Sequence, residues 1–401
     1  MEKENIVIGM AGAGRATELH MNALKSFSGI PIRLKTIFAR RDEQLLDNQK
    51  RYGFERITKD FNDLLSDPEI DVIDICTPPY LHESMIEQAL NADKHVICEK
   101  PLTGYFGTED ENDIGNTVSK EVMYQKVIAS LDKLEKQILK SSKKFMYAEN
   151  FIYAPAVLKS KEIIAKKKSK ILFIKGEESL KGSSSPVAGM WNKTGGGTFI
   201  RTGTHPLCAA LWLKSQEAIA RNEQISVVGV MADMGRVTNS LTPYEHRHIK
   251  ANPQDVEDTS TVILQFSDGT KAVIIANDTL LGGSRNYVEL YCNDCAIECK
   301  LTMSNLMSTY FLDEDNLDDV YISEMLPSKT GWNNPFLADE FVRGYNNQMK
   351  DFLECIYYDR QPISNFILGS YTIKLVYAAY AAAEKQQSVK IENMELLRLL
   401  G

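Results

Sequence analysis

The sequence lacks an apolar run that approaches the roughly 20 residues a membrane-spanning helix needs. Its first five residues, Met-Glu-Lys-Glu-Asn, lead directly into a strand-like segment and do not resemble a secretory signal. Cysteine is also scarce: seven residues, an odd number scattered over 401, predict reduced thiols and not a disulfide framework. We therefore expect a cytoplasmic protein with no membrane partner.

An excess of positive charge is absent as well. The chain carries 46 Lys and Arg against 54 Asp and Glu, a formal net charge of −8, which argues against nucleic acid as a partner. The composition, 43% hydrophobic and 25% charged, is that of an ordinary globular protein with enough length for two or three domains. A small-molecule ligand is the expected partner.

Strand-like and helix-like segments alternate through the first 148 residues. Apolar runs at 5–9, 32–39, 71–76 and 95–99 are separated by helical patterns at 18–27, 61–65 and 83–92, and a helix at 120–140 and a strand at 144–148 follow. This alternation predicts an α/β fold with a doubly wound parallel sheet. We therefore divide the chain into a Rossmann dinucleotide-binding domain, 1–148, and a second domain, 149–401.

A glycine turn joins the first strand to the first helix. Such a turn lets the backbone approach a pyrophosphate, whose charge the helix N-terminus binds. Thr17 stands where Gly or Ala is usual. The predicted cofactor contacts in this turn are Gly12, Ala13, Gly14, Arg15 and Ala16.

Arg40 stands at the end of the second strand. An acid at that position favours a cofactor with a free ribose 2′-hydroxyl, whereas an arginine tolerates a cofactor with a 2′-phosphate. Arg40 slightly favours NADP as the cofactor. An arginine also stacks on adenine, so this residue does not decide between NAD and NADP.

Two further strands end in turns that we expect to border the cofactor. Thr77 and Pro78 follow the strand at 71–76, and His82 begins the next helix, where a structural role near the nicotinamide is expected. Glu99 and Lys100 follow the strand at 95–99, so a cationic amine is presented where open α/β sheets place their chemistry. Lys100 is the first candidate for a catalytic residue.

Several motifs in a fixed order carry a family resemblance. They are GAGRAT at 12–17, TPPYLH at 77–82, HVICEKPL at 95–102, YAENFIYAP at 147–155, GGGTFIRTGTHP at 195–206 and FSDGT at 266–270. The chain resembles the Gfo/Idh/MocA family of nicotinamide-dependent oxidoreductases over nearly its whole length. The resemblance implies bound NAD or NADP, catalytic roles for Lys100 and His205, and a position beside the nicotinamide for Asn150, in contact with substrate or cofactor.

The segment 201–206 departs from that family. Well-known relatives pair an aspartate with a histidine four residues on, whereas this chain has Arg201 and His205. Arginine cannot serve as a base, so proton transfer falls to His205, Lys100 or both. Pro206 suits a first helical turn, and a histidine at a helix N-terminus is pushed towards its neutral, proton-accepting form. The planar fork of Arg201 is a candidate for holding substrate.

A long polar loop at 177–191 is predicted to form a wall of the substrate pocket, with serines as hydrogen-bond donors and Trp191 packing on sugar C–H surfaces. The predicted reaction is oxidation of a secondary ring hydroxyl of a sugar or glycoside, at C3, to a ketone. Alternatives are a redox-neutral NAD-dependent glycosidase, an inositol dehydrogenase, and a cofactor-binding subunit without catalysis. The C3 assignment, and a downstream enzyme that cleaves the product, rest on the resemblance alone.

The second half is rich in strands, at 225–232, 259–266, 271–278, 286–291 and 296–301, and predicts an α+β domain with one large, mostly antiparallel open sheet. The resemblance implies that such a sheet supports a homo-oligomer, a dimer or tetramer. Cys292 and Cys295 flank an expected hairpin turn, so no metal site is predicted. Helices are expected from a first turn at Pro206 to Leu213, and at 338–358 and 369–385. The acidic insertion at 103–122 departs from the family pattern and is either an assembly contact, a lid or a simple insertion.

Overall fold

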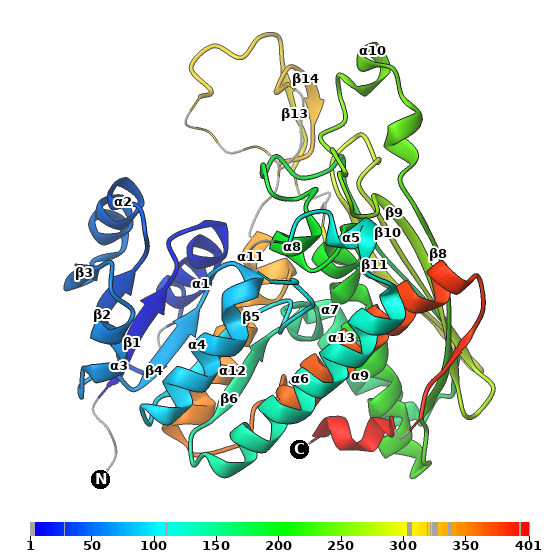
Figure 1. Cartoon of the computed structure of the whole chain (residues 1–401), viewed down its shortest axis with the longest axis horizontal. Coiled ribbons are helices and arrows are strands. Elements are labelled where there is room, and N and C mark those ends of the chain that lie inside the picture. The colour runs from blue at the N-terminus through cyan, green and yellow to red at the C-terminus, as the bar shows by residue number, and fades with distance from the viewer. Residues whose placement is uncertain are drawn as a thin grey trace.

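Two sheets lie side by side, with long helices between and around them (Figure 1). The computed structural model describes residues 5–27, 29–108, 111–302, 307–318, 320, 322, 328–335, 339–392 and 394–400. The first sheet is built from strands before residue 149 and the second from strands after residue 170. The boundary that we placed between residues 148 and 149 remains a proposal, and the first sheet ends there with Ala148.

The first sheet has six strands in the order β3-β2-β1-β4-β5-β6, and every pairing in it is parallel. The strands are β1 Ile6–Ala11, β2 Ile32–Phe38, β3 Arg56–Thr58, β4 Val72–Ile75, β5 His95–Glu99 and β6 Phe145–Ala148. The order reverses direction between β1 and β4. A doubly wound sheet binds its ligand at the carboxyl ends of the strands on either side of such a reversal.

Helices cover this sheet as the alternating pattern predicted. They are α1 Arg15–Lys25, α2 Asp42–Tyr52, α3 Asn62–Ser66, α4 His82–Asn91 and α6 Lys120–Lys140. All six residues of β1 are buried, as expected for a strand covered on both faces. The expected Rossmann fold is confirmed.

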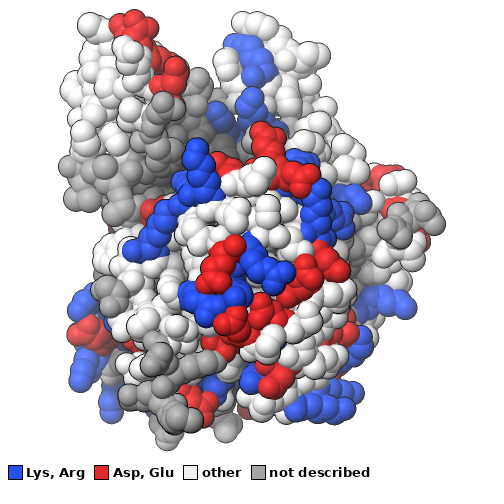
Figure 2. Space-filling view, turned by 90° about the vertical axis from the view of Figure 1, so that its left-hand side faces the viewer, with Lys and Arg blue, Asp and Glu red and all other residues white. Residues whose placement is uncertain are grey.

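The outer face of this half shows basic and acidic side chains interleaved with one another (Figure 2). Arg33 contacts both Glu55, at 2.5 Å, and Glu69, at 3.0 Å, while Lys35 is paired with Glu69. The charges of Arg33 and Lys35 are therefore balanced by neighbouring carboxylates.

The second sheet has seven strands in the order β12-β11-β7-β10-β9-β8-β15. They are β7 Ile171–Ser179, β8 Val227–Gly235, β9 Thr259–Phe266, β10 Lys271–Asn277, β11 Arg285–Cys292, β12 Ala296–Lys300 and β15 Val389–Lys390. The pairing of β10 with β7 is parallel and the other pairings are antiparallel, which confirms the expected mostly antiparallel sheet. The turn between β11 and β12 carries Cys292 and Cys295 as free thiols.

Helices α7 Pro155–Lys167, α9 Thr204–Arg221 and α13 Phe366–Lys385 pack in this half. Helix α13 is long and apolar enough to cross a membrane, but its most apolar window is 83% buried, as in a core helix of a globular protein. The smaller elements are α5 Ile114–Thr117, α8 Trp191–Thr194, α10 Pro243–His246 and the hairpin of β13 Thr309–Phe311 with β14 Gly331–Asn333.

Two expected helices have different bounds. Helix α9 does not stop at Leu213 but continues to Arg221, because the buried Lys214 is paired with Glu217 and Asp268 at 2.6 and 3.0 Å. The helix expected at 338–358 is broken into α11 Asp339–Val342 and α12 Tyr345–Tyr357. Gly344 between them has φ +97°, and a Cβ there would lie 2.3 Å from the carbonyl oxygen of Asn150.

The insertion at 103–122 docks on the second half of the same chain. The backbone N–H of Tyr105 donates to the hydroxyl of Tyr377 at 2.6 Å. The carboxylate of Asp255 accepts the N–H of Gly115 at 3.0 Å and that of Trp191 at 2.7 Å. The insertion is therefore tied to α8, and whether it also contacts another subunit stays a prediction.

The close approach of Gly115 to Asp255 yields a testable prediction. A Cβ at Gly115 would lie 1.9 Å from the carbonyl oxygen of Asp255, so Gly115→Ala must displace backbone. We expect a loss of about 1–3 kcal/mol in the free energy of unfolding, the usual cost of overpacking, measured by denaturant titration. Gly235→Ala, whose Cβ would be 3.7 Å from its nearest neighbour, is the matched control. Equal stability of the two variants would show that the insertion is not packed as described.

Candidate functional site

A groove of about 670 Å³ runs along the carboxyl ends of the first sheet. Of the predicted cofactor contacts it brings together six: Gly12, Ala13, Gly14, Arg40, Thr77 and Pro78. Gly12 has φ +119°, and a Cβ there would lie 2.4 Å from the carbonyl oxygen of Cys76, whereas a Cβ at Gly14 would meet nothing within 4 Å. The turn therefore leaves open space at the N-terminus of α1, as a pyrophosphate requires.

The remaining predicted cofactor contacts are not among the residues that line this groove. Arg15 forms an exposed pair with Glu18 at 2.7 Å, and Ala16 packs partly against the core. His82 is buried, its ring nitrogens each lie 2.9 Å from a backbone carbonyl, of Thr77 and of Pro101, and burial lowers its pKa. These contacts agree with the structural role expected for His82.

Asn150 is buried, and its amide donates to the carbonyl oxygen of Arg343 at 2.9 Å. The structure thus gives Asn150 a partner that holds α12 in place, and its contact with substrate or cofactor stays a prediction.

Glu99, at the end of β5, belongs to a buried chain of charged groups. The ring of His20 lies between two carboxylates: Nδ1 is 2.9 Å from Asp74 and Nε2 is 3.0 Å from Glu99. Burial opposes the charge on His20, but the Asp74 carboxylate outweighs it and raises the pKa of His20 well above its usual value. Burial likewise favours neutral Glu99, yet its hydrogen bond to His20 and the nearby charges of Lys100 and His205 lower its pKa.

This chain of charges also bears on metal binding. The ligand atoms of His20, Asp74 and Cys76 lie within 4.8 Å of one another, a spacing that suits a metal ion. Both ring nitrogens of His20 already contact carboxylates, however, so the ring has no lone pair left to give a metal.

Lys100 and His205 are brought to the same place, as the sequence predicted. The Lys100 ammonium donates to the carbonyl oxygen of Arg201 at 2.5 Å, and Arg201 lies four residues before His205 in a continuous helical segment. His205 is buried and stacks on Phe151, with ring centroids 4.8 Å apart.

One expectation about His205 is wrong. A π-helical turn, Phe199–Gly203, runs directly into α9, so His205 lies within a helix and not at its free N-terminus. Its two ring nitrogens face carboxylates: Nδ1 is 2.7 Å from Glu149 and Nε2 is 3.9 Å from Glu178. The sequence analysis missed both glutamates. Glu149 directly precedes Asn150 in a quoted motif, which is the one signal that pointed to it.

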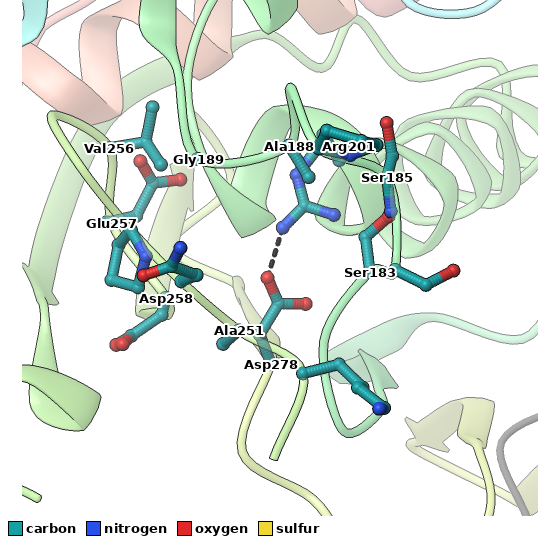
Figure 3. Close-up of a pocket in the computed structure, with 15 residues that line it drawn as sticks. Ser183, Ser185, Ala188, Gly189, Arg201, Ala251, Val256, Glu257, Asp258 and Asp278 are labelled. Carbon is teal, nitrogen blue, oxygen red and sulfur yellow. Dashed lines mark hydrogen bonds and ion pairs between the residues drawn. The ribbon is translucent and has the colours of Figure 1, made fainter. Parts of the chain in front are cut away.

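Arg201 lines a second cavity, of about 270 Å³, and its guanidinium is paired with Asp278 (Figure 3). Burial raises the pKa of Asp278, and the charge of Arg201 opposes that rise. The serines of the loop 183–185 also line this cavity, and Ser185 lies beside Arg201 (Figure 3). Ser185 lines both this cavity and the cofactor groove, so the two spaces adjoin.

The structure does not support the expectation that Trp191 lies on that wall. Trp191 begins α8, is buried, and packs on Tyr380 with centroids 4.8 Å apart, with the Lys120 ammonium 4.8 Å from its ring. It borders a different cavity, shared with Lys120 and Tyr380. The tryptophan therefore serves as a packing residue that anchors the loop, while the serines and their neighbours Pro186, Ala188 and Gly189 line the cavity beside Arg201.

Glu257 lines both of these cavities and is buried. Its carboxylate accepts the backbone N–H groups of Gly197 and Phe199, each at 2.8 Å, and the Tyr380 hydroxyl at 3.0 Å. A Cβ at Gly197 would lie 1.9 Å from the Glu257 carbonyl oxygen, which explains the need for glycine there. Burial outweighs the donors and raises the pKa of Glu257 to about 7.

The raised pKa of Glu257 makes stability depend on pH. Between about pH 4.5 and 7 the folded state holds a proton that the unfolded state has released, so stability falls as pH rises. We expect the free energy of unfolding of the wild type, relative to Glu257→Gln, to fall by about 3 kcal/mol between pH 4 and 8. Chemical denaturation at several pH values measures it, with the exposed Glu298→Gln as control. A constant difference would contradict the assignment.

Comparison with known proteins places the chain in a family. Residues 6–123 match the family described as "Oxidoreductase family, NAD-binding Rossmann fold", and residues 170–298 match the "GFO/IDH/MocA C-terminal domain". The chain is 28% identical to levoglucosan dehydrogenase of Pseudarthrobacter phenanthrenivorans over 71% of this chain and 70% of that protein. It is 22% identical to myo-inositol 2-dehydrogenase of Thermotoga maritima over 96% and 99%.

Among solved structures, that of GenD2 from gentamicin A biosynthesis in complex with NAD superposes with a TM-score of 0.78 at 19% identity, and the match covers 98% of each chain. At that identity the superposition shows the fold alone. Together with the two family matches, it confirms the nicotinamide-binding Rossmann domain and the sheet-rich second half. The chain therefore belongs to the Gfo/Idh/MocA family of NAD-binding oxidoreductases.

Proposed function

We propose that the protein is an NAD(P)-dependent dehydrogenase that oxidises a secondary ring hydroxyl of a sugar or glycoside, at C3, to a ketone. The observation that carries the proposal is the meeting of Lys100 with the helical segment of His205 beside two adjoining cavities. The named relatives act on a sugar and on an inositol, which supports a polyol substrate. The departure at Arg201 favours a sugar or glycoside over a free inositol.

The groove fits a dinucleotide cofactor. The open space at Gly14, the left-handed turn at Gly12 and the position of Arg40 are the features such a cofactor requires. A bound nicotinamide would supply the hydride acceptor. The residues of this chain would then hold the alcohol against it and take the proton.

His205 is the proposed proton acceptor. The Glu149 carboxylate accepts a hydrogen bond from Nδ1, which fixes the tautomer in which Nε2 carries the lone pair. Stacking on Phe151 holds the ring plane. The hydroxyl proton of the substrate would pass to Nε2 of His205 as hydride leaves the carbon that carries this hydroxyl.

Lys100 is proposed to orient the reacting oxygen and to stabilise the negative charge that develops on it. Its ammonium has three donors, and the bond to the Arg201 carbonyl uses one of them. Arg201 itself, paired with Asp278, is proposed to form the cavity wall that selects the rest of the sugar.

The first test is the absorbance at 340 nm of the purified protein with NAD and NADP in separate wells, against sugars, inositols and aryl glycosides. We expect reduced cofactor to accumulate with a sugar or glycoside, and faster with NADP, because Arg40 lines the groove where an acid would select NAD. Release of aglycone without reduced cofactor would instead indicate a redox-neutral glycosidase. No change in absorbance with any compound of the panel, although the cofactor is bound, would indicate a protein that binds the cofactor without catalysis.

Substitution of the two proton-capable residues tests the mechanism. Lys100→Met and His205→Asn should each lower kcat by about 10²–10⁴-fold, the usual contribution of a general acid or base. The affinity for cofactor, followed by NADH fluorescence, should change little in His205→Asn. The exposed Lys126→Met is the control for loss of a lysine. Full activity in either active-site variant would remove that residue from the mechanism.

A further inference from the structure

Two neighbouring strands of the second sheet carry buried polar atoms that have no hydrogen-bond partner among the described residues. These atoms are Oε2 of Glu178, on β7, and both Oδ1 and Nδ2 of Asn286, on β11. Each residue is only 4% exposed. An unsatisfied buried polar group costs about 1–3 kcal/mol, so three such atoms in one place need an explanation.

The register of the sheet brings these atoms together. Glu178 and Asn286 are direct partners in the antiparallel pairing of β7 with β11, so their side chains leave the same face of the sheet. On the other side of β7, Ala276 of β10 is the partner of Glu178. A Cβ at Gly203, in the turn before His205, would lie 3.2 Å from the Cβ of Ala276, so this face of the sheet lies against that turn.

His205 lies beside the same atoms. Its Nε2 is 3.9 Å from Oε2 of Glu178, too long for a direct hydrogen bond, while Glu149 occupies Nδ1 on the other side of the ring. An oxygen atom placed between Nε2 and Oε2 can lie about 2.8 Å from both. The other oxygen of Glu178, Oε1, is 3.6 Å from the Arg343 guanidinium.

The chemistry of these groups matches that of a polyol. An ionised carboxylate accepts hydrogen bonds only, while an amide both donates and accepts, and a hydroxyl group does the same. Neighbouring hydroxyls on a sugar ring would therefore give a hydrogen-bond partner to each of the three unpaired atoms of Glu178 and Asn286. An anionic ligand would not fit, because the Glu178 carboxylate would repel it.

We propose that Glu178 and Asn286 form a subsite for neighbouring hydroxyl groups of the polyol, in which the reacting hydroxyl lies between Glu178 Oε2 and His205 Nε2. The inference rests on the proposed function and adds two binding residues that the motifs did not reveal.

The test uses Glu178→Gln and Asn286→Ala in the full-length protein, with steady-state kinetics on the polyol that the 340 nm screen identifies. We expect KM for that polyol to rise at least about tenfold in Glu178→Gln, since one lost hydrogen bond to a charged group is worth about 1.5–3 kcal/mol, and by about two- to tenfold in Asn286→Ala, where neutral hydrogen bonds of about 0.5–1.5 kcal/mol are lost. The Kd for NADH should be unchanged. Glu289→Gln, on the same strand as Asn286 but partly exposed, is the control.

The melting temperature separates this subsite from a structural role. Asn286→Ala removes two unsatisfied buried atoms and should leave the melting temperature of the free protein unchanged or higher, whereas loss of a structural residue would lower it. Stabilisation of the NADH-bound protein by the polyol should be lost in both variants. Unchanged KM and unchanged stabilisation would overturn the subsite and leave ordered water as the partner of these atoms.

The same measurements distinguish failure of the proposed function from failure of the subsite. If the wild type reduces no cofactor with any polyol, the proposed function fails. Polyol-dependent stabilisation that Glu178→Gln and Asn286→Ala abolish would then still support the subsite, and its absence from the wild type would overturn it.

Discussion

The hydrogen bond from the Lys100 ammonium to the Arg201 carbonyl joins the two halves of the site. Lys100 directly follows the fifth strand of the first sheet, and Arg201 lies in the turn that leads into α9. The bond therefore places the cofactor side and the histidine side at a fixed distance, although 100 residues separate them in sequence. Ser185 borders both the groove and the cavity, so the two spaces are neighbours.

Buried charges around this contact occur in opposite-sign pairs. Asp74, His20 and Glu99 alternate in sign beneath Lys100, and Asp278 faces Arg201. A buried ion pair contributes little net stability, but loss of one partner leaves an uncompensated charge at a cost of several kcal/mol. The pairs therefore act mainly to hold the lysine and the arginine in one geometry.

Much of the fold could be predicted from the sequence, because it depends on local patterns. The βαβ alternation, the glycine turn and the strands of the second sheet follow from periodicity and turn residues. The pairing of His205 with Glu149 and Glu178, the burial of Trp191 and the break at Gly344 could not, since each depends on which distant segment packs there. Gly344 is the clearest case: its glycine is required by the backbone of Asn150, nearly 200 residues earlier.

The arginine at position 201 is the departure that the structure explains best. A family member that loses the aspartate from this turn needs acceptors from elsewhere, and three carboxylates surround the site from three other elements. Glu149 follows β6, Glu178 lies on β7 and Asp278 follows β10. Of these, Asp278 neutralises the arginine and Glu149 orients the histidine, so Glu178 alone keeps a carboxylate oxygen that is both near Nε2 and unpaired. An acid supplied by a strand is held more rigidly than one on a turn, which suits the role that we propose for Glu178 in positioning a hydroxyl.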